Sequence, residues 1–171
     1  MASGDFDPVR MLSVLAEERV QFVLIGGMAA ILHGDVGVTV DLDVVPDSDA
    51  ANLERLARAL RTLGARIRTE GEPEGLAFDC SAQFFANLSP DSIVNMTTEA
   101  GDLDVTFRPS GTRGFPDLQR DAIEIEAAAR LHIRVASLPD IIRSKEAAAR
   151  EKDRIALPRL RRLLDRLRES E

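Results

Sequence analysis

The chain has 171 residues, of which 44% are hydrophobic and 30% are charged, and this composition suits one compact globular domain. The longest apolar run, residues 20–32, contains Gln21 and two glycines and is shorter than the roughly 20 residues that span a bilayer. The N-terminal segment lacks the basic-then-apolar order of a secretory signal, and the single cysteine, Cys80, excludes an internal disulfide. We therefore expect a reduced, cytoplasmic protein without a membrane span.

The net charge of −7 is unevenly distributed. Residues 143–171 carry ten Lys or Arg against six Asp or Glu, a net charge of +4, which leaves −11 for residues 1–142. An acidic body discourages non-specific binding to nucleic acid or anionic membranes, whereas a basic end suits phosphates or an acidic partner. On charge alone, an ordinary solvated helix face explains the basic end equally well.

Hydrophobic periodicity predicts helices and strands in alternation over the first part of the chain. In chain order these are a helix at 8–18, a strand at 22–25, a turn at Gly26-Gly27, a short buried helix at 28–33, a strand at 41–45 and a helix that ends before Gly64. Ser48 or Asp49 is suited to cap the last of these helices, and Gly64 is suited to stop it.

The pattern continues with shorter elements. In chain order these are a strand at 65–68, an acidic loop at 70–75, a weak helix at 81–87, strands at 92–98 and 103–107 joined by a hairpin, a loop at 109–114, and strands at 123–127 and 131–135. Ser137 and Asp140 have the spacing of a capping box that opens a helical region. The order predicts an α/β (α+β) fold with a mixed sheet flanked by helices, a core at residues 1–136 and a helical extension at 137–171 packed on it.

Asp41 and Asp43 are the most informative pair in the chain. They lie one residue apart on an apolar strand, so their side chains point to the same face. Neighbouring carboxylates repel each other, and a divalent metal facing a phosphate is the usual partner for such a pair. An edge strand with both carboxylates in water is the alternative.

Further motifs surround this pair in a definite order. Gly26-Gly27 follows a strand, Thr39 lies two residues before Asp41-Leu42-Asp43, a later strand carries a third carboxylate, and Lys145 precedes Lys152-Asp153. This order resembles the minimal nucleotidyltransferases of the polymerase-beta type and is most similar to the small bacterial nucleotidyltransferase proteins of the AbiEii toxin kind. The resemblance extends from about residue 22 to residue 160.

The resemblance implies a metal-dependent site. Asp41 and Asp43 would hold two Mg²⁺ ions, and Asp104 would share one of them and accept the proton of the attacking hydroxyl. Asp102 has the same strand parity as Asp104 and is the alternative third carboxylate. Asp104 is preferred because the apolar pattern of its strand continues beyond it.

The resemblance also implies a triphosphate site. Gly26 and Gly27 would let the backbone approach the phosphates, and Lys145 would contact them through its flexible charged stem. Lys145 and Lys152 lie seven residues apart, close to two helical turns, so both can face one side. Asp153 is expected to cap a helix that begins near residue 156, with Pro158 in its first turn.

Other polar residues carry no predicted role. His33 and His132 lie far apart and lack the spacing of a zinc site, and Cys80 lacks an activating neighbour. Two positions depart from the family pattern. Gly37 stands where many relatives carry an arginine, and Gly27 stands where many carry a serine.

The sequence therefore predicts transfer of a nucleoside monophosphate from a nucleoside triphosphate to a hydroxyl, with release of pyrophosphate. The acceptor is left open between a tRNA end, a protein side chain and a small molecule. A toxin of a toxin–antitoxin pair would have a cognate antitoxin as its partner. The alternatives are an aminoglycoside-type nucleotidyltransferase, a catalytically inactive binding or regulatory module of the same fold, and a structural protein that assembles through its Leu/Arg-rich end.

Overall fold

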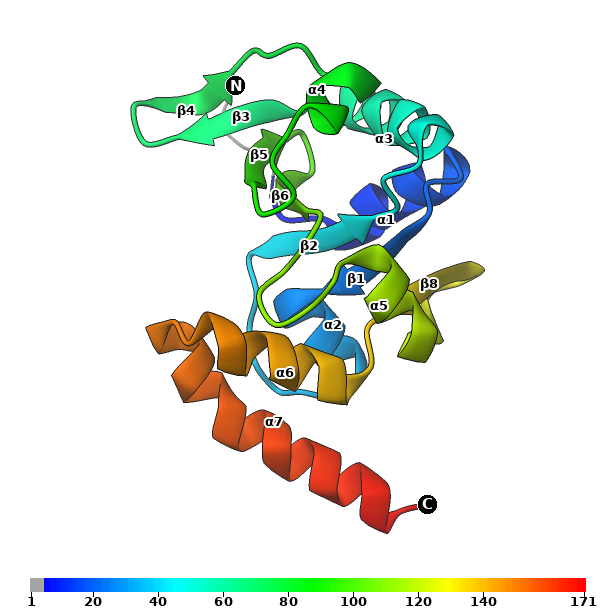
Figure 1. Cartoon of the computed structure of the whole chain (residues 1–171), viewed down its shortest axis with the longest axis vertical. Coiled ribbons are helices and arrows are strands. Elements are labelled where there is room, and N and C mark those ends of the chain that lie inside the picture. Colours follow the sequence, from blue (N-terminus) through cyan, green and yellow to red (C-terminus); the bar gives the residue numbers. More distant parts are fainter. Residues whose placement is uncertain (1–4) are drawn as a thin grey trace.

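A computed structural model describes residues 5–171 as one mixed sheet with helices packed on it (Figure 1). The strands are β1 (Phe22–Ile25), β2 (Asp41–Pro46), β3 (Arg66–Thr69), β4 (Glu72–Leu76), β5 (Ile93–Thr98), β6 (Gly101–Thr106), β7 (Ile123–Ala128) and β8 (Leu131–Val135). The helices are α1 (Pro8–Glu17), α2 (Gly26–Leu32), α3 (Ala50–Thr62), α4 (Ala82–Ala86), α5 (Phe115–Asp121), α6 (Leu138–Ala148) and α7 (Glu151–Glu169).

The eight strands follow the order β4-β3-β5-β6-β2-β1-β8-β7. β2 runs parallel to β6 and β1 runs parallel to β8, while the remaining neighbours are antiparallel. The predicted mixed sheet flanked by helices is therefore confirmed. β2 lies in the middle of the sheet, so its aspartates are not on an edge strand.

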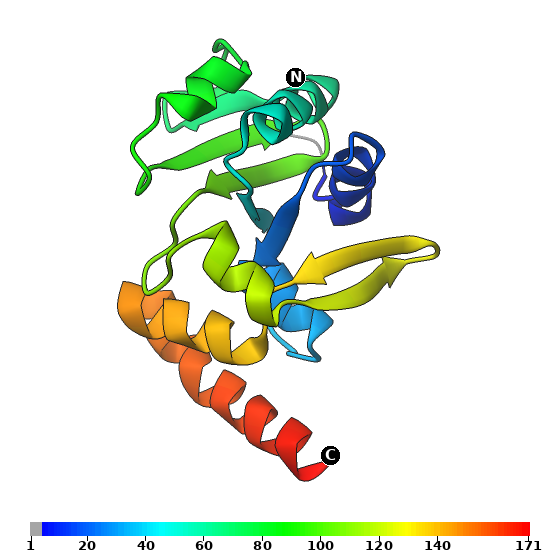
Figure 2. The ribbon, with the colours of Figure 1, turned by 45° about the vertical axis from the view of Figure 1, so that its right-hand side comes forward.

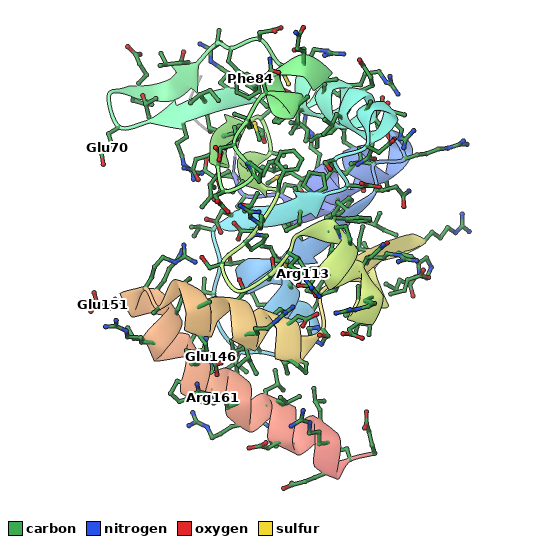
Figure 3. The ribbon with its side chains drawn as sticks, viewed as in Figure 1. Glu70, Phe84, Arg113, Glu146, Glu151 and Arg161 are labelled. Atoms are coloured by element: carbon green, nitrogen blue, oxygen red, sulfur yellow. The ribbon has the colours of Figure 1, made fainter. Side chains whose placement is uncertain are left out.

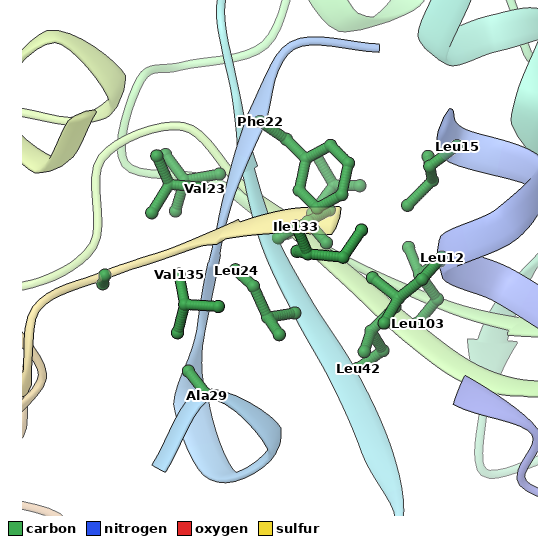
Figure 4. Close-up of a cluster of buried hydrophobic side chains, with 14 of the residues drawn as sticks. Leu12, Leu15, Phe22, Val23, Leu24, Ala29, Leu42, Leu103, Ile133 and Val135 are labelled. Atoms are coloured by element: carbon green, nitrogen blue, oxygen red, sulfur yellow. The ribbon is translucent and has the colours of Figure 1, made fainter. Parts of the chain in front are cut away.

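One face of the central strands builds a hydrophobic core under α1. Leu12 and Leu15 of α1 project toward the sheet, where Leu12 lies near Leu42 of β2 and Leu103 of β6 and Leu15 lies on the side of Phe22 (Figure 4). Leu12, Leu15, Leu42 and Leu103 are almost completely buried. Side chains alternate along a strand, so Asp41 and Asp43 must point to the opposite face. The packing of Leu42 thus decides on which side of the sheet the carboxylates gather.

Two elements differ from the expectation for the middle of the chain. Residues 72–76, predicted as loop, form the edge strand β4, which pairs only with β3. An edge strand tolerates Pro73 and charged residues because one of its sides has no ladder to complete. α5 was not predicted, because the polar run after Gly114 conceals a helix that begins with Phe115-Pro116.

Lys145 and Lys152 line the same pocket, as expected, but they lie on two different helices and not two turns apart on one. α6 ends where Ala149 takes a left-handed conformation with φ 51°, and α7 begins at Glu151, five residues before the predicted start. Asp153 lies in the first turn of α7, where it accepts the backbone N–H of Arg150, and Pro158 lies inside the helix. The chain folds back at this break, so α7 packs against α6.

The α6–α7 pair lies beside α2 at one side of the sheet (Figures 1 and 2). Leu157, Leu160 and Leu163 supply the buried stripe of α7. At the surface, Glu146 and Arg161 lie toward each other across the two helices, with 2.7 Å between their oxygen and nitrogen atoms (Figure 3). Within residues 5–171, none of the helices has the length and apolar character needed to cross a membrane.

Candidate active site

The parallel pairing of β2 and β6 brings together aspartates that are 61 residues apart in sequence. Its register sets Asp41 opposite Asp102 and Asp43 opposite Asp104. Carboxylate oxygens of Asp41, Asp43 and Asp104 all lie within 4.8 Å of one another. Among residues 5–171 this is the only group of three or more side chains with the composition and proximity of a metal site. Its all-oxygen donor set is the kind that Mg²⁺ prefers.

Arg68 of β3 separates the roles of Asp102 and Asp104. Its guanidinium lies 2.9 Å from an oxygen of Asp102 and 2.9 Å from Oδ1 of Asp104. Asp102 is therefore paired with an arginine beside the cluster, whereas Asp104 belongs to the cluster and also contacts Arg68. The geometry agrees with the choice of Asp104 over Asp102, although the catalytic role of Asp104 stays a prediction.

The carboxylate cluster is electrostatically unfavourable in the protein alone. Burial, and then the charges of Asp41 and Asp104, raise the pKa of the Asp43 carboxyl to about 7. Burial also raises the pKa of Asp104 to about 6, although the Arg68 guanidinium opposes that change. A bound divalent cation would remove this repulsion, so the residues present fit a metal.

Two glycines allow the start of α2 to lie against these carboxylates. Gly26 has φ +76°, and a Cβ at this position would collide with the Asp43 carboxylate. A Cβ on Gly27 would lie 2.9 Å from both Cβ and Oγ1 of Thr39, so a serine does not fit there without movement. Thr39 in turn donates to the backbone oxygen of Asp41 at 3.1 Å. Glycine is therefore required at both positions by close approach.

Facing the carboxylates is a group of cations from α6 and α7. Nζ of Lys145 lies 3.4 Å from the completely buried Asp153, which also receives the Arg150 side chain at 2.9 Å. Lys152 has no carboxylate partner among the described ion pairs, lines the same pocket, and lowers the pKa of Asp43. Lys145 is thus held by a counterion, whereas the ammonium group of Lys152 is available.

A second arginine enters the site from α7. Arg159 forms a two-pronged pair with Asp35, with Nε 2.6 Å from Oδ1 and Nη2 3.1 Å from Oδ2. This hydrogen bonding lowers the pKa of Asp35. A Cβ on Gly37 would lie 2.8 Å from Nη2 of Arg159 and 2.7 Å from the Asp35 carboxylate. The guanidinium therefore occupies the space that a side chain at position 37 would need.

All six predicted site residues line one pocket of about 460 Å³ between the sheet, α2, α6 and α7. They are Gly26, Gly27, Asp41, Asp43, Asp104 and Lys145. The wall beyond Asp104 is mixed in character, with Ile93 and Asn95 from β5 and Ser110 and Thr112 from the loop before α5. The pocket thus combines an anionic wall, a cationic wall and a neutral wall that is partly polar and partly apolar.

The residues to which the sequence assigned no role lie apart from this chemistry. His33 makes a 2.7 Å hydrogen bond with the backbone oxygen of Ala136, and His132 lies near Glu124 on the exposed β7–β8 hairpin. Burial raises the pKa of the Cys80 thiol to about 11, which disfavours the reactive thiolate.

Comparison with solved structures places the chain in the nucleotidyltransferase fold. The lincosamide antibiotic adenylyltransferase LnuA, in its lincomycin-bound form, matches with a TM-score of 0.59 at 16% identity, over 94% of this chain and 99% of LnuA. A Thermotoga maritima protein provisionally assigned as a nucleotidyltransferase matches with a TM-score of 0.52 at 15% identity, over 95% of this chain and 97% of that protein. No protein-family model matches the chain, and no curated protein matches its sequence.

Three residues of the site escaped the sequence reasoning, namely Arg68, Asp35 and Arg159. Arg68 sits on a short strand whose position beside β5 no local pattern reveals. Arg159 carried a usable signal, because it lies seven residues after Lys152 and therefore on the same face of α7. The role of Asp35 could not be predicted from the sequence, because it depends on its pairing with Arg159, 124 residues later in the chain.

Proposed function

We propose that the protein is a magnesium-dependent nucleotidyltransferase that moves a nucleoside monophosphate from a nucleoside triphosphate to a hydroxyl of a small organic molecule. The observation that carries this proposal is the cluster of Asp41, Asp43 and Asp104, which faces the cations of α6 and α7 across one pocket. Three acidic groups opposite basic groups suit a metal-bound polyphosphate better than either charge alone.

The residues would divide the work as follows. Asp41, Asp43 and Asp104 would hold Mg²⁺, and two ions are expected from the resemblance. When bound, the metal would neutralise phosphate charge and lower the pKa of the attacking hydroxyl. Asp104, with Oδ1 held by Arg68, would accept the proton of that hydroxyl.

The cationic wall would hold the triphosphate. Lys152 would contact it directly, and Lys145 would do so from a position fixed by Asp153. Gly26 and Gly27 would allow the phosphates to approach the backbone at the start of α2. The pairing of Lys145 with a buried carboxylate supports a fixed position for its charge rather than a mobile one.

The acceptor is proposed from the neutral wall and from LnuA. LnuA is described as an adenylyltransferase of lincosamide antibiotics, and this chain spans 99% of its length. Ile93, Asn95 and Thr112 offer both apolar and hydrogen-bonding surface beside Asp104, which suits a small amphiphilic alcohol. A tRNA end or a protein acceptor, a cognate antitoxin and closer similarity to the AbiEii toxins stay predictions of the sequence.

Calorimetry with each of the four nucleoside triphosphates and Mg²⁺ tests the proposal. The wild type should bind at least one triphosphate, and the variant D41N/D43N should lose metal-dependent binding. A labelled-nucleotide assay with lincosamides, aminoglycosides, total tRNA and protein extract then identifies the acceptor class. Binding that is absent in the wild type would exclude the enzyme, and binding without transfer to any acceptor would favour the inactive binding module.

A further inference from the structure

The ion pair between Arg159 and Asp35 links the C-terminal helix to the segment that leads into β2. Arg159 is 35% exposed in its side chain, whereas its partner Asp35 is 5% exposed. Both residues line the pocket that contains the carboxylate cluster. The buried Asp35 carboxylate therefore holds the Arg159 guanidinium at the wall of the pocket.

The ion pair with Asp35 engages only some of the N–H donors of Arg159. A guanidinium has five N–H donors in a rigid plane, and the pair with Asp35 employs Nε and Nη2. Nη1 takes part in none of the hydrogen bonds described for residues 5–171. A planar fork that is fixed on one edge keeps its remaining donors in a defined direction, which favours binding of a phosphate.

The position of Arg159 relative to the carboxylates assigns it to one end of a polyphosphate. Arg159 pairs with Asp35 on the segment that leads into β2, and it is not part of the cluster of three carboxylates. The reacting phosphate belongs at the metal-binding carboxylates. A phosphate held by Arg159 would therefore be one of the phosphates that do not react.

We propose that Arg159, locked by Asp35 in the space that Gly37 leaves empty, binds the terminal phosphates of the nucleoside triphosphate and thereby selects triphosphates over monophosphates. The assignment rests on the proposed nucleotidyl transfer. It also gives a physical reason for glycine at position 37, because a side chain there would displace the guanidinium. A binding arginine would then come from α7 instead of from the segment before Asp41.

Inorganic pyrophosphate with Mg²⁺ is the direct probe, because it carries no base or ribose. We expect R159M to weaken pyrophosphate binding in calorimetry by about 10- to 100-fold, the range that charge-assisted hydrogen bonds span. Mn²⁺ binding to the carboxylates, measured by electron paramagnetic resonance, should stay within about threefold, because the metal ligands are unchanged. Arg162, an exposed arginine of the same helix, supplies the matched control R162M, which should bind pyrophosphate like the wild type.

Asp35→Asn separates phosphate binding from a purely structural clamp. Both R159M and D35N break the pair between α7 and the segment before β2, but only R159M removes the cation. D35N keeps the cation but releases its anchor, so it should weaken pyrophosphate binding less than R159M does, and an equal loss in both variants would overturn the assignment. Gly37→Ala provides a further test if R159M does not fold, because it pushes the guanidinium aside without removing charge, and it should weaken pyrophosphate binding.

The outcomes distinguish this inference from the proposed function. Wild-type protein that binds triphosphates, together with R159M that binds pyrophosphate equally well, would refute the role of Arg159 alone. Wild-type protein that binds neither triphosphate nor pyrophosphate would refute both. A large loss of pyrophosphate binding in R159M, a smaller loss in G37A and D35N, and no loss in R162M would establish the site.

Discussion

The two charged walls of the pocket are prepared in opposite ways. On the sheet, Asp43 and Asp104 lie close to like charges, and their pKa values are raised to about 7 and about 6. On the helices, Lys145 and Arg159 each have a carboxylate of their own, Asp153 and Asp35. The carboxylates of the anionic wall thus repel one another without a ligand, whereas two cations of the opposite wall, Lys145 and Arg159, are already paired.

This difference indicates how binding energy would be used. A divalent cation at the carboxylates would relieve repulsion that the folded chain maintains, so binding and stability are coupled there. At the helices, the cations are held in position before the substrate arrives, which reduces the ordering cost of binding. Active sites commonly sacrifice stability at the group that does the chemistry.

The largest effect should come from removing the anionic wall. D41N/D43N should lower nucleotidyl transfer by at least about 1,000-fold, because metal-assisted stabilisation is worth several kcal/mol. A steady-state assay, with an acceptor that the labelled-nucleotide experiment identifies, measures the loss. Arg162→Met, outside the pocket, is the control. Nucleotidyl transfer that survives the double substitution would show that Asp41 and Asp43 are not needed for catalysis.

The pH dependence of the free energy of unfolding should reveal the repulsion among the carboxylates without any substrate. The pKa of Asp43 is raised from 3.8 in the unfolded chain to about 7, so the metal-free protein should lose stability as the pH rises from about 4 to about 7 and level off above that. Between pH 5 and pH 8 we expect a loss of about 3 kcal/mol, measured by urea denaturation in the presence of a chelator.

Two controls sharpen that measurement. The carboxyls with lowered pKa values, Asp35, Asp117 and Asp153, lose their contribution only at pH values below their unfolded-state pKa of 3.8, outside this window. Asp43→Asn should flatten the profile, and Mg²⁺ should restore stability at pH 8 in the wild type alone. A wild-type profile that is flat from pH 5 to pH 8 would contradict the burial of an ionisable cluster.

The cationic wall should respond differently at its two lysines. Lys145→Met removes a partner of the buried Asp153 and should cost about 1–3 kcal/mol in the free energy of unfolding. Lys152→Met should change stability by less than about 0.5 kcal/mol, as expected for an exposed side chain, yet weaken triphosphate binding. Denaturation and calorimetry on both variants test the contrast, which fails if the two lysines behave alike.

The smallest effect on ligand binding should come from Asp102, the carboxylate beside the cluster. Asp102→Asn leaves Arg68 paired with Asp104 and should change stability by less than about 1 kcal/mol. Mn²⁺ affinity should stay within about threefold of the wild type, because Asp102 lies outside the group of three. A loss of Mn²⁺ binding comparable to that of D41N/D43N would reassign the third ligand.

The sequence by itself determined the elements whose signals are local. Alternation placed Asp41 and Asp43 on one face of β2, and apolar periodicity located α1 and α3 within a few residues. The capping-box spacing at Ser137 located the start of α6. The order of the glycines, the paired aspartates and the late lysines was enough to predict the nucleotidyltransferase fold. The edge strand β4 and the short helix α5 were missed, because their residues carry no periodic apolar pattern.

Tertiary structure decided which of these residues meet. The parallel register of β2 and β6 brings Asp104 into the cluster, and Arg68 from a third strand takes Asp102 out of it. The break at Ala149 folds α7 back so that Arg159 reaches Asp35, 124 residues earlier in the chain. Such contacts depend on strand order and helix packing, which are set by burial of the whole core and not by any local pattern.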